Sequence, residues 1–346
     1  MFVKNNLMYK YLVFALIVSF AVTTKAQINC PVLGNTRTLP TQAQCEEIKS
    51  RKVVVMLPEL DENKIKQFEK KKEYDELAQY KKDFALYKQA IKDGVKEHWS
   101  LHDFVSYKST EEVMSLAKKG NKDYVVIIFG GAYSEYVNGA LKLRFSFGYS
   151  GGEREFDKKE AEVYNQKCLI IAPIEKVDVA ESLINSVHLA ISLPHAMIDN
   201  ESIVYGIDFV NYVVKQKLAD KTFSHHDISK NAPKLSAYTL AVNQEDWSTE
   251  ISTADAKDKY GLTITLMDSL AFNTLLNTGQ PGIAYAVKMG PYLSVVLSDT
   301  REVVYLTGLG DKFMFKLTAY ISEKELENLQ QKIAGMKVEG EGEENE

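Results

Sequence analysis

Short apolar runs rich in β-branched residues alternate along the chain with segments whose apolar residues recur every three or four positions. The runs at 53–57, 105–107 and 124–129 predict buried strands. Between the first two runs, apolar residues spaced three or four apart over 77–95 predict a helix of about five turns. We interpret this helix as covering one face of a sheet. A seam for a partner helix is the alternative interpretation.

The same order of elements returns 159 positions later in the chain. Ser109 and Asp268 are equivalent predicted N-caps, and Gly120 and Gly279 are equivalent helix ends. The predicted strands of this second half are 238–242, 262–266 and 283–287. Each half also ends in a predicted hairpin, formed around 141–147 in the first and by 292–297 with 303–306 in the second. The pattern indicates an internal repeat, although two unrelated strand–helix–strand segments would look similar.

The elements between the halves are predicted to be a strand at 169–174 and helices at 179–193 and 203–218. The fold class is therefore α/β, with α+β still open. The molecule is expected to hold two similar β-α-β-α-β-plus-hairpin units, joined by a helical segment. The expected divisions are an arm at 27–50, a first unit at 51–175, a helical connector at 176–230, a second unit at 231–336 and an acidic disordered tail at 337–346. This element order is similar to that of periplasmic α/β modules such as the amino-terminal domain of TolB. The similarity concerns element order alone, so it implies a fold and no activity.

The first 26 residues are typical of a secretory signal peptide. Lys4 and Lys10 precede an apolar run at 11–22, and small residues lead to a predicted cleavage after Ala26. The run is too short to span a bilayer, which needs about 20 helical residues. An uncleaved anchor and a lipoprotein modified at Cys30 are the alternatives. We therefore expect an exported protein, periplasmic or secreted, with no transmembrane span after cleavage.

Export permits disulfides, and the chain has three cysteines. Cys30 and Cys45 flank a loop of about 15 residues, and a bridge between them would add about 3 kcal/mol in the chain-entropy model. We expect that disulfide. Cys168 opens an apolar run and is expected to be a buried thiol. No Cys-x-x-Cys pair is present, which argues against a thioredoxin-type motif and a zinc ribbon.

Composition and charge narrow the classes of function. The 346 residues are 45% apolar and 26% charged, as in ordinary globular proteins, and the formal net charge is −5. A general nucleic-acid binder is therefore disfavoured. No phosphate-binding glycine motif occurs, so no cofactor is predicted. His98 and His102 could share a metal on a continuous helix, but no third ligand accompanies them, and we predict no metal site.

Two groups of residues are candidate sites. Ser224 is followed by His225, His226 and Asp227, a hydroxyl, two imidazoles and a carboxylate that could serve hydrolysis. The alternative interpretation is a polar loop, because neighbouring residues on a turn rarely converge on one point. The candidate ligand-binding residues follow predicted strands and would face a groove between the halves: Gly130, Gly131, Met289 and Gly290.

Two main hypotheses of function follow. The first is an exported, non-catalytic binding or envelope-assembly protein with a partner in the envelope or outside the cell. The alternative is an exported hydrolase that acts on a glycan or peptide through His225, His226 and Asp227. A third class is an assembly or scaffold protein that acts through the 77–95 helix.

Overall fold

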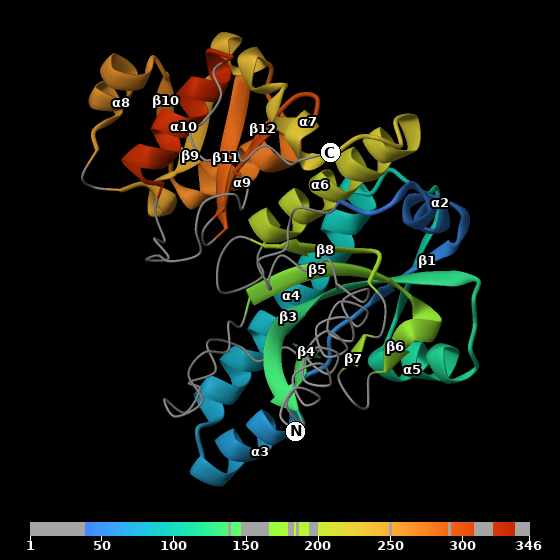
Figure 1. Cartoon of the computed structure of the whole chain (residues 1–346). Helices are drawn as coiled ribbons and strands as arrows, with labels where there is room; N and C mark the ends of the chain where they lie inside the picture. Colours follow the sequence, from blue (N-terminus) through green and yellow to red (C-terminus); the bar gives the residue numbers. More distant parts are fainter. Residues whose placement is uncertain are drawn as a thin grey trace, which may run out of the picture.

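The computed structural model describes residues 39–137, 140–146, 166–178, 183–184, 187–193, 200–248, 251–289, 292–307 and 321–335. Within them the chain forms two mixed sheets with helices packed against them, as Figure 1 shows. The predicted α/β class is confirmed, and the two sheet units are similar. The signal segment and Cys30 lie outside the described residues.

The first sheet has the order β2-β1-β3-β5-β8. Its first three strands are parallel, and β5 and β8 continue antiparallel. The bounds are β1 (Lys52–Met56), β2 (Val105–Lys108), β3 (Tyr124–Val137), β5 (Gln166–Pro173) and β8 (Leu189–Ser192). A further strand, β4 (Ala140–Ser146), forms an antiparallel hairpin with β3.

The second sheet repeats this topology with the order β10-β9-β11-β12-β13. Here too the first three strands are parallel and the last two antiparallel. The bounds are β9 (Thr239–Asn243), β10 (Ile264–Met267), β11 (Ile283–Met289), β12 (Tyr292–Leu297) and β13 (Val303–Leu306). The predicted strands of both halves are therefore present in the predicted arrangement.

The two sheets also share their strand register. In each sheet the middle one of the three parallel strands has partners at equivalent positions: Val53 of β1 pairs with Val105 and Val125, and Leu240 of β9 pairs with Ile264 and Ala284. Each partner in the second sheet lies 159 positions after its counterpart, 264 against 105 and 284 against 125. Because a one-residue slip would exchange the two faces of a strand, this agreement places equivalent side chains on equivalent faces.

The helices repeat as well. Ser109 caps α5 (Thr110–Lys118) and Asp268 caps α9 (Ser269–Thr278), each accepting a backbone N–H of the first turn. Gly120 and Gly279 follow the two helices with φ of 62° and 68°, a left-handed conformation that glycine adopts without steric cost. The crossover between the first two strands carries α3 (Glu62–Lys71) and α4 (Tyr74–His98) in the first unit and the short α8 (Thr253–Tyr260) in the second.

Each unit closes with a helix after its last strand. These helices are α6 (Asn200–Ala219) in the first unit and α10 (Glu323–Ile333) in the second. The helix α6 packs against α4 and α2 (Gln42–Ser50) on one side and against α9 on the other. One apolar core consequently runs from the first sheet through α6 to the second sheet. Two further cores lie on the outer faces of the sheets.

Two expectations from the sequence are wrong. The segment 179–193 is no helix where the structure describes it: it contributes β7 (Leu183–Ile184), which pairs with β6 (Val177–Asp178), and then β8. Its apolar run fits helical spacing, but pairing of Leu189 with Ile171 extends the first sheet. Short apolar runs are ambiguous between the two structures.

The second error concerns the predicted Cys30–Cys45 disulfide. Cys45 is a free thiol, fully buried on the inward face of α2 beside Ile48. Burial raises the pKa of this thiol to about 12; Lys217 opposes this rise to a smaller extent, and Glu46 adds to it. The side chain therefore behaves as a small core hydrophobe. Cys168 is a buried thiol, as predicted.

Candidate functional site

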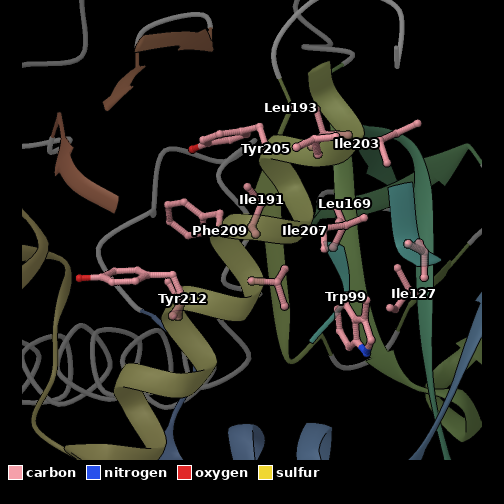
Figure 2. Close-up of a cluster of buried hydrophobic side chains, with 14 of the residues drawn as sticks. Trp99, Ile127, Leu169, Ile191, Leu193, Ile203, Tyr205, Ile207, Phe209 and Tyr212 are labelled. Atoms are coloured by element: carbon pink, nitrogen blue, oxygen red, sulfur yellow. The ribbon is translucent and has the colours of Figure 1, made fainter. Parts of the chain in front are cut away.

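The helix α6 has two different faces. Figure 2 shows Tyr205, Phe209 and Tyr212 projecting from one side of the helix, while Leu169 and Ile127 of the first sheet lie on the other. Both faces are buried, so α6 is the structural element that joins the two units. The face toward the second sheet is aromatic and, at Asp208, charged.

Asp208 lies at the centre of this face with 3% of its surface exposed. Its Oδ1 lies 3.5 Å from Nδ1 of His98, the last residue of α4. Its Oδ2 lies 3.4 Å from Nη1 of Arg301, in the turn between β12 and β13. One carboxylate therefore contacts a side chain from each unit.

The position of Arg301 depends on a special backbone conformation. Its φ is 60°, which is uncommon for a residue other than glycine. Its backbone N–H donates to Leu297 O at 2.9 Å and closes the turn. Its Nη2 donates to Asn277 O at 3.3 Å, near the carboxyl end of α9. The guanidinium is thereby held against both α9 and Asp208.

Three hydroxyl groups extend this polar contact across the interface. They belong to Tyr205 on α6, Tyr285 on β11 and Ser294 on β12, all fully buried. Burial raises the pKa of Tyr285 well above its ordinary value; the Asp208 carboxylate adds to this, and Arg301 opposes it. Burial likewise raises the pKa of Tyr205, with the Ser294 hydroxyl opposing. Both phenols therefore stay protonated at neutral pH.

We refer to these groups as the inter-unit seam, which consists of His98, Tyr205, Asp208, Tyr285, Ser294 and Arg301. Within the described residues, the three hydroxyls and Nε2 of His98 make no hydrogen bond of normal geometry to protein, so the contacts of Ser294 with Tyr205 and of Arg301 with Tyr285 are weak. The one carboxylate and the one guanidinium balance each other in charge. The seam holds no activated nucleophile, so its chemistry suits coupling of the two units rather than bond cleavage.

The predicted catalytic group has a structural role at Asp227. Residues 225–229 form the short helix α7 (His225–Ser229), and Asp227 Oδ2 accepts from the backbone N–H and the hydroxyl of Ser224 at 2.7 and 2.8 Å. Lys230 donates to Oδ1 at 2.6 Å. Partial burial raises the pKa of Asp227, but the bonds from Lys230 and Ser224 outweigh it and hold the pKa at about 2. The backbone of His225 and His226 lies in α7, and their side chains are outside the described residues.

The predicted ligand-binding glycines do not lie in a loop. Gly130 and Gly131 are inside β3, where they pair with Cys168 and Lys167 of β5. Met289 ends β11 at the position equivalent to Gly130, and Gly290 is outside the described residues. The strand predicted at 124–129 is therefore too short, because β3 continues to Val137. The groove between the halves stays a prediction, although α6 packs between the two sheets.

His98 and His102 have separate partners. His98 faces Asp208, whereas Nδ1 of His102 accepts the indole N–H of Trp99 at 3.2 Å. Among the residues that the structure describes, no group of three or more His, Cys, Asp or Glu is placed to hold a metal ion.

The sequence did contain one signal for the seam. Asp208 is a lone acidic residue in the middle of the apolar segment 203–218, and an acidic residue is almost never fully buried unless paired. Its partners His98 and Arg301 are distant in sequence and could not be found by spacing.

In the described part of the chain, no helix has the length and apolarity to cross a membrane. No protein-family model, no curated protein and no solved structure matches the sequence or the fold.

Proposed function

We propose that this is an exported, non-catalytic binding protein, made of two similar α/β units, with a partner in the cell envelope or outside the cell. The observation that carries the proposal is the state of Asp227. Asp227 is the only acid of the predicted catalytic group. Its ionised carboxylate accepts hydrogen bonds from Ser224 and Lys230. A general base needs a free lone pair within reach of its substrate, and these contacts compete for it.

The architecture supports binding over turnover in a second way. The charged groups between the units are engaged with each other, and the phenols beside them stay protonated. Fold alone assigns no activity, so the proposal rests on how the polar groups are used.

The test is capture of partners from the native envelope fraction by the mature chain, followed by mass spectrometry. A captured partner is then purified and its affinity for the protein is measured. The variant Asp227→Asn should bind as the unchanged protein does. Turnover of a glycan or peptide by the purified protein, abolished in Asp227→Asn, would instead establish the hydrolase.

Export is tested separately by the intact mass of the protein recovered from outside the cytoplasm. We expect its first residue to be at or near Gln27, because cleavage is predicted after Ala26. An exported species that still carries residues 1–26 would contradict the cleavage. Accumulation in the cytoplasm would contradict the site of function.

A further inference from the structure

We propose that the inter-unit seam is a latch: the second unit can move away from α6, and the Asp208 carboxylate holds the joint closed. Asp208 contacts a titratable group of the first unit, His98 on α4, and a charged group of the second, Arg301 in the β12–β13 turn. The inference goes beyond the proposed function and does not depend on which partner is bound.

The polar groups at the joint make long contacts or lack hydrogen bonds of normal geometry. The two contacts of Asp208, at 3.5 and 3.4 Å, are longer than the 2.7–2.9 Å of strong charge-assisted hydrogen bonds. The hydroxyls of Tyr205, Tyr285 and Ser294 are buried without a hydrogen bond of normal geometry to the described protein atoms. Groups in this state lose hydration without full compensation, so they favour an open joint in which water reaches them.

The apolar side of the joint favours closure. Phe209 and Tyr212 of α6 belong to the same core as Phe272 and Leu275 of α9. The closed state therefore reflects a balance between apolar contact and incomplete polar pairing. The charge of Asp208 shifts this balance toward the closed state. Without it the Arg301 guanidinium has no carboxylate partner, and hydration of the guanidinium favours the open state.

The two ends of the molecule differ from this joint. The outward positions of α10, the helix equivalent to α6, include the exposed polar residues Glu323, Lys324 and Glu327. On the other end, η3 (Ile174–Lys176) and β6 lie against α5, the helix equivalent to α9. One end of the molecule is therefore polar, and the other is covered by a neighbouring segment. The inter-unit seam differs from both ends because a polar cluster lies there between two packed units.

The experiment measures the distance between the units in the full mature chain. Cysteines replace the exposed residues Glu111 on α5 and Lys324 on α10 in a Cys30→Ser background and carry spin labels. The native Cys45 and Cys168 are fully buried and should not react. Pulsed dipolar spectroscopy then gives the distribution of distances between the two units.

In the labelled protein with an unchanged seam, we expect one narrow distribution of distances between the two labels. Asp208→Asn should add a population at longer distance, while the circular dichroism spectrum stays native. The double variant Asp208→Leu with Arg301→Met should return the narrow distribution, because a well-packed apolar pair replaces a buried ion pair without a charge left over. The control Asp93→Asn removes an exposed carboxylate on α4 and should change nothing.

A folded Asp208→Asn protein with the narrow distribution of the unchanged seam would overturn the latch. If that variant does not fold, Arg301→Gln is measured in its place, since Arg301 lies at the exposed edge of the seam. A narrow distribution in Arg301→Gln would overturn the proposal equally. A longer population in the double apolar variant would also overturn the proposal, because the joint would then open with no charge left unpaired.

Discussion

Asp227 stabilises the start of α7 through contacts made by a single carboxylate. Replacing it by Asn removes the charge that Lys230 contacts at 2.6 Å and weakens acceptance from Ser224. We expect Asp227→Asn to lower the free energy of unfolding by about 1 kcal/mol at neutral pH. Urea unfolding followed by circular dichroism measures this change.

The same substitution should change the response to acid. The pKa of Asp227 is held at about 2, below the ordinary 3.8, so the ionised carboxylate stabilises the fold above pH 3.8. That contribution is lost as the pH falls from 3.8 through about 2. The difference between the unchanged protein and Asp227→Asn should therefore shrink over this interval. The control Asp258→Asn, an exposed acid on α8, should show neither effect; a pH-independent difference for Asp227→Asn would contradict the assignment.

Residues such as Ser109, Asp268, Gly120 and Gly279 could be assigned from the sequence because their roles are local. An N-cap acts on a backbone N–H within three positions, and a left-handed glycine acts at its own φ. The partners of Asp208 could not be assigned in this way. They are fixed by how α6 packs against α4 and the second sheet, which spacing along the chain does not encode.

At the scale of elements, the crossing of α4 over α6 depends on Gly94. A Cβ at this position would lie 2.5 Å from Cγ2 of Ile203, closer than packed atoms approach. Alanine would favour helix by about 1 kcal/mol in an unpacked helix. Here we expect Gly94→Ala to be net destabilising, because moving packed helices apart costs about 1–3 kcal/mol.

A double-mutant cycle tests the cause of that loss. Ile203→Ala removes the methyl group that the new Cβ would meet, at the expense of a cavity. The double variant Gly94→Ala with Ile203→Ala should therefore be more stable than the sum of the two single changes predicts. Additive free energies of unfolding, or a stabilised Gly94→Ala protein, would show that the crossing tolerates a larger residue.

Elements with a strong period and a clear boundary were predictable, whereas β8 and the distal half of β3 were not. The α5 and α9 helices have caps, apolar periods and glycine ends, so their bounds were found from the sequence. The strand β8 was predicted as helix because four apolar-rich residues fit either period. Only its contact with β5 decides between them. For the same reason β3 was predicted too short, since β4 pairs with its distal half.

At the scale of the whole molecule, the two units are joined through the α6 side of the first and the α9 side of the second. Equivalent surfaces therefore do not face each other, and the joint is head-to-tail. The repeat itself was predictable from the 159-residue offset. The joint was not, because it depends on the burial of α6 on both faces. Its consequence is that the two units share one core and should not be energetically independent.

Because the two units share one core, two core positions of the second unit should differ in whether their truncation affects the first unit. Phe272 on α9 lies in the core that continues through α6 to the first sheet, whereas Leu326 on α10 lies in the outer core of the second unit; both are fully buried. Truncation to alanine should cost about 3–5 kcal/mol for Phe272 and about 2–5 kcal/mol for Leu326. Hydrogen exchange at β1 and β3 reports whether the first unit is affected. We expect Phe272→Ala to accelerate exchange there as well as in β11, and Leu326→Ala to accelerate it in the second sheet alone. If Phe272→Ala leaves β1 and β3 as protected as before, the units are independent, and the continuous core carries no coupling between them.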